Sequence, residues 1–357
     1  MLLREVRSTA AGKSATIRLV RARLFLLLAL PLALAACGGS SNTLPKPAEQ
    51  HLVYVAGGSP ATSSVWVANV DGSHPRRLTR GSVASLTPDG KAVAVKRPDG
   101  IYLVSSRGGS PRKLTSQPIE PRGWSPDGKT LVATKSTQSA VVALMLIDRS
   151  TGQVRTLARG SLYGYDFSPK GDELVYSRAP QATEAGICGD LMDLYVAEVA
   201  GGKPKQLTHN GFSAFPVWGP SKIAFSRFPQ SFDIQDCAAP GVWTIDPKPG
   251  SRPQAIVARA PNELSVSGDY GLQPLDWLDD GHLLVGVRTD FGTQGAELDA
   301  SNGKLRQLKD YAQEGSRDGR FYVGSGGEEG VDLTIVRVSD GKRVFHRRDA
   351  CCPDWNR

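Results

Sequence analysis

A turn that recurs about every 40 residues constrains this fold more than any other feature of the sequence. Its clearest copy is Trp-Ser-Pro-Asp-Gly at residues 124–128, and an apolar run follows at 131–133. Proline presets φ at the first corner of a turn, aspartate tolerates the next corner, and glycine takes the position with φ > 0. The pattern therefore predicts two antiparallel strands joined by a tight turn.

Weaker copies of this turn are found along the whole chain. The turn glycines Gly90, Gly128 and Gly171 lie 38 and 43 residues apart, and Gly281 and Gly319 are again 38 apart. After each copy come an apolar strand, a second strand closed by a short turn, and a short strand that is often basic. Helical periodicity is almost absent. A period near 40 with four strands per unit is typical of a β-propeller.

These units resemble the WD-like repeat of TolB-type propellers, and the resemblance covers residues 52–357. The matched pattern is Trp-Ser-Pro-Asp-Gly, an apolar strand, an Ile/Leu-Tyr-Val strand ending in Asp-Gly, and Arg-x-Leu-Thr. Only the unit at 121–157 has Trp-Ser-Pro-Asp-Gly in full. TolB-type propellers commonly have six blades, whereas seven units can be counted here. We therefore predict an all-β propeller of seven four-stranded blades, with six blades as the alternative.

The end of the chain predicts how the ring closes. The first unit begins at Leu52 and lacks the Pro-x-Trp strand that opens the unit at 216–218. Residues 353–355, Pro-Asp-Trp, resemble this missing piece. Because an open seam between two apolar blades would be exposed, we predict that the C-terminal segment is the innermost strand of the first blade. The first-strand tryptophans are then expected to pack between blades and not to serve as ligand platforms.

The first 36 residues predict export. Six Lys/Arg precede an apolar run of thirteen residues at 24–36, which is too short for a permanent membrane span. The end of this run and the next residue, Leu-Ala-Ala-Cys at 34–37, resemble a bacterial lipobox, and a plain secretory signal is the alternative. We predict that residues 1–36 are a signal peptide, that Cys37 is lipidated, that 37–51 form a flexible tether, and that 52–357 form the propeller. The expected location is the extracytoplasmic side of a bacterial cell membrane, with the protein held by its lipid anchor.

The charge of the chain argues against nucleic acid as a partner. The leader has six basic residues and one acidic residue, so the formal net charge of +8 falls to +3 without it. No stripe of Lys/Arg interleaved with aromatic residues appears. We therefore expect no nucleic-acid partner, and we expect a monomer.

Long insertions are predicted to lie together on one face of the ring. In a four-stranded blade the 2–3 loops and the connections between blades share a face, and the insertions at 178–193, 227–241 and 258–272 fall there. Long loops on a rigid scaffold usually carry binding. The binding-face candidates are acidic: Glu184, Asp190, Asp193, Asp233, Asp236 and Asp269. No Asp-x-Asp-x-Asp-Gly loop or paired histidine is present, so we expect neither a metal nor a cofactor.

The four cysteines beyond Cys37 allow three pairings, and export would preserve disulfides. Cys188 and Cys237 occupy equivalent insertions of neighbouring units, so we predict that they pair. Cys351 and Cys352 remain near the closing connection. They are expected to form a vicinal disulfide, and the alternative is that one of them pairs elsewhere. A vicinal ring would be redox-labile, and a structural clamp at the ring closure is the alternative role.

Catalysis is not expected from the sequence. No Gly-x-Ser-x-Gly motif occurs, no second α/β domain follows the repeats, and the five histidines are scattered. We predict a non-catalytic scaffold that binds an envelope protein or peptide through the insertion-bearing face. The alternatives are an envelope enzyme, a hydrolase or lyase, at the mouth of the central channel, and a sensor of a small ligand or sugar. Converging histidine and carboxylate side chains would favour the enzyme, and a deep apolar pocket would favour the sensor.

Overall fold

The computed structural model describes residues 51–57, 59, 62–136, 141–179, 192–228, 240–259, 271–289, 292–316, 318–325 and 332–355. Within these ranges the chain forms 28 β-strands and no helix. Accordingly, the described residues contain no helix able to cross a membrane. The predicted signal peptide, the predicted lipidation site Cys37 and nearly all of the tether lie outside the described residues.

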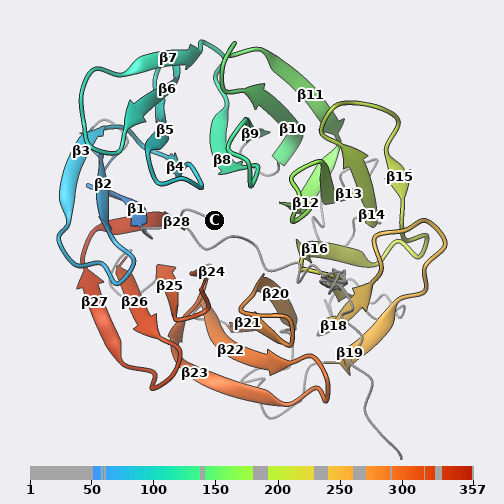
Figure 1. Ribbon diagram of the computed structural model, residues 1–357. Helices are drawn as coiled ribbons and strands as arrows, with labels where there is room; N and C mark the ends of the chain where they lie inside the picture. The colour runs from blue at the N-terminus through green and yellow to red at the C-terminus, as the bar shows by residue number, and fades with distance from the viewer. Residues whose placement is uncertain are drawn as a thin grey trace, which may run out of the picture. The chain divides into compact units, whose positions relative to one another are not determined.

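The strands form seven four-stranded sheets arranged as blades around a central axis (Figure 1). The all-β, seven-bladed prediction is therefore confirmed over the six-bladed alternative. From the axis outward the strands are as follows: in blade 1, β28 (Ala350–Trp355), β1 (His51–Ala56), β2 (Ser64–Asn69) and β3 (Arg76–Arg80); in blade 2, β4 (Ala84–Leu86), β5 (Ala92–Arg97), β6 (Gly100–Ser105) and β7 (Arg112–Thr115); in blade 3, β8 (Glu120–Trp124), β9 (Thr130–Ser136), β10 (Val141–Asp148) and β11 (Val154–Arg159); in blade 4, β12 (Ser161–Phe167), β13 (Glu173–Ala179), β14 (Asp193–Glu198) and β15 (Lys205–Gln206). Blades 5 to 7 continue in the same order: in blade 5, β16 (Ser213–Trp218), β17 (Ile223–Arg227), β18 (Pro240–Ile245) and β19 (Gln254–Arg259); in blade 6, β20 (Leu272–Trp277), β21 (His282–Thr289), β22 (Gly292–Asp299) and β23 (Leu305–Tyr311); in blade 7, β24 (Glu314–Gly315), β25 (Phe321–Ser325), β26 (Leu333–Arg337) and β27 (Arg343–Arg347).

The ring closes where its two ends meet in blade 1. Strand β28 pairs antiparallel with β1, with Trp355 opposite Leu52 and Cys351 opposite Val55. The side chain of Trp355 is buried in a cluster that also contains Tyr54 and apolar residues of β25 and β26 in blade 7. The prediction that the C-terminal segment forms the innermost strand of the first blade is thus confirmed, and Trp355 packs between blades 7 and 1.

The core consists of apolar layers between neighbouring blades. In β9, Leu131 packs with Ala94 and Ile101 of blade 2, whereas the next residue, Val132, packs with Leu174 of blade 4. Successive residues of a strand point to opposite faces, so a strand covered on both faces is apolar throughout. Each fully buried aliphatic side chain contributes about 1.5–3 kcal/mol relative to an exposed one.

The recurring turn has the structure that its sequence predicts. Gly128 has a φ of +68°, and Asp127 Oδ1 accepts hydrogen bonds from Ser125 Oγ at 2.7 Å and from the Lys129 N–H at 3.0 Å. Burial acts to raise the pKa of Asp127, but these hydrogen bonds outweigh it and hold the pKa below its ordinary value. The turn is therefore fixed by its own side chains, and it aligns the first two strands of the blade.

Candidate functional site

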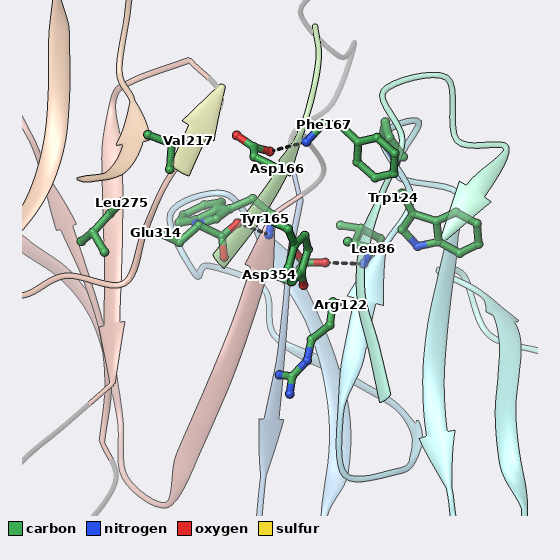
Figure 2. A pocket seen from close by; sticks show the side chains of 13 residues that line it. Leu86, Arg122, Trp124, Tyr165, Asp166, Phe167, Val217, Leu275, Glu314 and Asp354 are labelled. Atoms are coloured by element: carbon green, nitrogen blue, oxygen red, sulfur yellow. Dashed lines mark hydrogen bonds between the residues drawn. The ribbon is translucent and has the colours of Figure 1, made fainter. Parts of the chain in front are cut away.

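A cavity of about 260 Å³ lies at the centre of the ring, and the innermost strand of every blade contributes to its wall (Figure 2). The lining side chains come from the carboxyl ends of these strands, beside the short turns that follow them. The strand ends that border the insertions, such as Ala179 of β13 and Arg227 of β17, are the opposite ends. The residues that line the cavity are Leu86, Pro88, Arg122, Gly123, Trp124, Tyr165, Asp166, Phe167, Val217, Leu275, Glu314, Asp354 and Trp355.

One position recurs in all seven innermost strands, namely the residue just before the last residue of the strand, which we call the penultimate position. In four blades a carboxylate occupies it: Asp166, Asp276, Glu314 and Asp354. The other three blades have Ser85, Gly123 and Val217 there. Three of the four carboxylates belong to the cavity wall.

The penultimate carboxylates connect neighbouring blades. Asp354 Oδ2 accepts a hydrogen bond from the Leu86 N–H at 2.7 Å, and Asp166 Oδ2 accepts one from the Trp218 N–H at 2.8 Å. In each case the donor is the last residue of the innermost strand of the next blade (Figure 2 shows the bond to Leu86). An innermost strand is an edge strand. The backbone N–H groups on its unpaired edge, which faces the axis of the ring, therefore need acceptors from outside the sheet. We call such a bond between blades a seam bridge.

The same arrangement closes the ring between blades 7 and 1. Glu314 Oε1 accepts a hydrogen bond from the Trp355 N–H at 3.2 Å. Between blades 6 and 7 the last strand residue is Gly315, and a Cβ placed there would lie 3.3 Å from Asp276 Oδ2. Small size at this position leaves room for the carboxylate of Asp276.

Where the penultimate residue is not acidic, a tryptophan can form the seam bridge instead. Trp124 Nε1 donates to the Ser85 carbonyl at 3.3 Å, and Trp277 Nε1 donates to the Val217 carbonyl at 3.4 Å. Each tryptophan lies in the blade that follows its acceptor. These first-strand tryptophans therefore pack between blades, as the sequence predicts.

Arg122 brings positive charge to the cavity wall. Its guanidinium donates to Glu120 Oε2 at 2.8 Å and to Thr134 Oγ1 at 2.9 Å, and Lys96 Nζ donates to Glu120 Oε1 at 2.6 Å. Burial acts to raise the pKa of Glu120, but the bond from Lys96 and the two cations lower it overall. In Figure 2 the guanidinium points away from Asp166 and Phe167. Arg122 is thus held in an ion-pair network of blades 2 and 3.

Several ionisable side chains line the cavity wall. Its ionisable residues are Arg122, Tyr165 and three carboxylates, and no histidine is among the lining residues that the structure describes. Each of the three carboxylates accepts a hydrogen bond from a backbone N–H of the next blade. Across the described ranges, no group of three or more His, Cys, Asp or Glu residues could hold a metal ion.

Among the predicted binding-face residues, Asp193 is described. It begins β14, and its Oδ1 accepts bonds from Thr208 Oγ1 at 2.8 Å, the Asn210 N–H at 3.1 Å and the Gly211 N–H at 3.2 Å. The carboxylate thereby fixes the connection that leads into β16, and it is not part of the cavity wall. The remaining candidates lie outside the described residues: Glu184, Asp190, Asp233, Asp236 and Asp269.

The structure joins Cys351 and Cys352 in a vicinal disulfide within β28. Cys351 is half-buried and packs against the cluster that contains Val53 and Val55, whereas Cys352 is exposed. The predicted pairing of Cys188 with Cys237 lies outside the described residues.

Sequence reasoning missed the penultimate carboxylates. Asp166, Asp276 and Asp354 each directly precede an aromatic residue that ends a first strand, and this shared position was the available signal. The insertions drew attention to the opposite face, because length is visible in a sequence and proximity across blades is not.

No protein-family model matches the chain, and no curated protein matches it significantly. Solved structures with similar folds include TolB from Acinetobacter baumannii, at 19% identity and a TM-score of 0.49, covering 87% of this chain and 67% of that chain. The acylaminoacyl peptidase of Pyrococcus horikoshii is 14% identical with a TM-score of 0.58, covering 84% of this chain and 50% of that chain. An oligogalacturonate lyase in complex with manganese is 16% identical with a TM-score of 0.54, covering 85% of both chains.

The similarities to the peptidase and the lyase agree with the propeller fold and leave the activity open, because one propeller scaffold supports many functions. The chain spans about half the length of the peptidase. Its structural neighbours include TolB, peptidases and a lyase, and the chain itself is a seven-bladed β-propeller.

Proposed function

We propose that this protein is a non-catalytic propeller that binds another protein or a peptide in the cell envelope, and that a lipid on Cys37 holds it at the membrane. The observation that carries the proposal is the use of the cavity carboxylates as seam bridges. Asp166, Glu314 and Asp354 each accept a backbone N–H from the next blade. Groups committed to the integrity of the ring are poor acids and bases but good fixed charges.

The cavity suits a single side chain of a partner. Its volume of about 260 Å³ is below the roughly 300–1,000 Å³ of typical small-molecule pockets. Aromatic residues such as Tyr165 and Phe167 lie in the wall beside the three carboxylates. Aromatic rings and carboxylates together attract a cation, and the charge of Arg122 in the same wall is offset by its ion pair with Glu120. We therefore propose that a partner loop inserts a lysine or arginine side chain at this end of the channel.

The insertion-bearing face remains a second proposed contact. The insertions belong to the 2–3 loops and to a connection between blades, which lie at the other ends of the strands from the cavity wall. A partner that uses the cavity and a partner that uses the insertions would thus contact opposite faces. Variants can therefore separate the two contacts.

A cavity-filling variant provides the sharpest test. A Cβ placed at Gly123 meets no atom within 4 Å, so Gly123→Leu should fill the cavity without disturbing the blade. Gly281→Leu is the matched control, because a Cβ there lies 3.6 Å from Asp279 Oδ1, an ordinary contact, and Gly281 is outside the cavity wall. Partners would be captured from membranes with the full chain, both variants, and a chain lacking residues 180–191 and 229–239, which leaves every strand of blades 4 and 5 intact.

Each outcome of the capture experiment identifies a different contact face. Loss of capture with Gly123→Leu, but not with Gly281→Leu, supports the cavity as the contact. Loss only on deletion of the insertions moves the contact to the other face. Specific capture that survives in every variant contradicts both proposed contacts.

Anchoring is tested separately. Metabolic labelling with a palmitate analogue should mark the full chain and should fail for Cys37→Ala. Equal labelling of the two chains would contradict a lipid at Cys37.

A further inference from the structure

The vicinal disulfide lies directly before the residues that attach blade 1 to both of its neighbours. After Cys351 and Cys352 come Asp354, whose carboxylate bridges to Leu86 in blade 2, and Trp355, whose N–H bridges to Glu314 in blade 7. Both seams of the closing strand therefore depend on the backbone that leaves this disulfide.

The backbone at Cys352 is unusual. Its φ is +56°, a left-handed conformation that non-glycine residues rarely adopt. In β16, Phe215 has a φ of +53° and likewise lies three residues before the terminal tryptophan, Trp218. The register of both strands with their neighbours shifts in this region. The two innermost strands thus share one bulge, and blade 5 forms it without a cysteine.

Different forces hold the two bulges. Phe215 packs edge-to-face on Tyr163, with ring centroids 6.4 Å apart, in a cluster that includes Met192. Cys352 is exposed, and none of the hydrophobic clusters of the described residues includes it. A left-handed non-glycine residue needs a compensating constraint from its surroundings. At Cys352 the ring formed by the disulfide supplies the constraint that aromatic packing supplies at Phe215.

Access to the two sulfur atoms is unequal. Cys351 is half-buried against the cluster of Val53 and Val55, and Cys352 is exposed. Thiol–disulfide exchange depends on access to one sulfur, with the other sulfur as leaving group. The Sγ of Cys352, the more exposed residue, is therefore taken as the point of attack, and Cys351 Sγ as the leaving group.

We infer that Cys351–Cys352 is a thiol–disulfide exchange site for a dithiol reductant, and that its reduction loosens the closing strand β28. One thiolate of the reductant forms a bond to Cys352 Sγ, the Cys351–Cys352 bond breaks, and Cys351 Sγ takes the electron pair and a proton. The second thiol of the reductant then displaces Cys352, which leaves as a thiolate and is protonated. Two electrons and two protons pass to the protein, and the reductant becomes a disulfide.

Peptide mapping tests the site. Trypsin releases residues 349–357, a peptide that contains both cysteines. From the unreduced full chain this peptide should be unalkylated and two hydrogen masses lighter than the dithiol form. After dithiothreitol it should carry two alkyl groups. A cross-link to a peptide with Cys188 or Cys237, or two alkyl groups before reduction, overturns the assignment.

Hydrogen exchange tests the loosening. With dithiothreitol, the amides of β28 and its partner β1 should exchange roughly tenfold faster, while the amides of blade 3 should not change. The variant Cys188→Ser/Cys237→Ser should keep this response. Unchanged exchange in β28 and β1 after mapped reduction, or loss of the response in that variant, contradicts the inference.

A variant with glycine at position 352 tests whether the disulfide acts by holding the left-handed backbone of the bulge. Cys351→Ser/Cys352→Ser should exchange fast in β28 with or without the reductant. Cys351→Ser/Cys352→Gly should exchange more slowly than this, because glycine adopts φ > 0 without a Cβ penalty. Equal exchange in the two variants would show that the left-handed residue is not what the disulfide constrains.

Discussion

The carboxylate of Asp354 accepts a 2.7 Å hydrogen bond from the backbone N–H of Leu86, a residue 268 positions earlier in the chain. This bond joins the innermost strands of blades 1 and 2 and belongs to a set that recurs between blades around the axis. The set uses two devices, a carboxylate at the penultimate position or a tryptophan from the next blade. The wall of the central cavity is consequently also the element that holds the ring together.

Removing the Asp354 carboxylate should destabilise the ring. Asp354→Ala leaves the Leu86 N–H without its charged acceptor, which costs about 1–3 kcal/mol in the free energy of unfolding. Asp354→Asn keeps an acceptor and should lose less. Guanidinium denaturation measures both. Asp280→Ala, in an exposed turn, is the control, and an equal loss there would contradict a specific role for Asp354.

Truncating Trp355 should be more damaging. Its side chain is 2% exposed, and Trp355→Ala should cost about 3–5 kcal/mol through lost burial and the cavity left behind. Trp355→Phe should cost less than Trp124→Phe. Trp124 Nε1 donates to Ser85, whereas Trp355 Nε1 has no partner among the described residues. Thermal and denaturant unfolding measure the loss of stability in the two phenylalanine variants. A larger loss for Trp355→Phe than for Trp124→Phe would contradict the prediction.

Replacement by alanine should lower the stability strongly at one of two glycines on neighbouring innermost strands and hardly at the other. Gly164 has a φ of +94°, and a Cβ there would lie 2.9 Å from Phe215 Cα, so Gly164→Ala should cost about 2–3 kcal/mol. Gly123→Ala meets open space and should change stability by less than about 0.5 kcal/mol. Chemical denaturation compares the pair. Similar costs would show that the contact with Phe215 does not limit this position.

The turn at Asp148 should give stability that depends on pH. Hydrogen bonds from the Ser150 hydroxyl and from the Thr151 N–H and hydroxyl lower the pKa of Asp148 from 3.8 to about 2. The folded state thus prefers the carboxylate, so its contribution is present above pH 4 and is lost as pH falls from about 4 to about 2. The difference in unfolding free energy between the native chain and Asp148→Asn should shrink over that range. A difference that is constant from pH 7 to pH 2 contradicts the prediction.

Local chemistry explains why the fold could be predicted. The turn at Asp127 and Gly128 depends on residues within a few positions of each other, so its sequence reports its structure directly. The spacing of such turns gave the number of blades. The Pro-x-Trp pattern shared by residues 216–218 and 353–355 identified the closing strand, because equivalent strands meet equivalent environments.

The cavity could not be predicted in the same way. Whether Asp166 binds a partner or the Trp218 N–H depends on the position of the next blade, 52 residues on, and no local pattern records it. Asp193 shows the converse. It looked like a surface carboxylate beside an insertion, but three donors from residues 208–211 surround it.

The pairing of β1 with β28 also has a consequence for biogenesis. Blade 1 remains a three-stranded sheet with an open apolar edge until residues 350–355 have been made, because no earlier segment occupies that place. Contacts separated by roughly 300 residues form late and slowly. During synthesis this edge can template pairing with other nascent chains. A holding chaperone would therefore raise the yield of this polypeptide most when it acts on the first hundred residues.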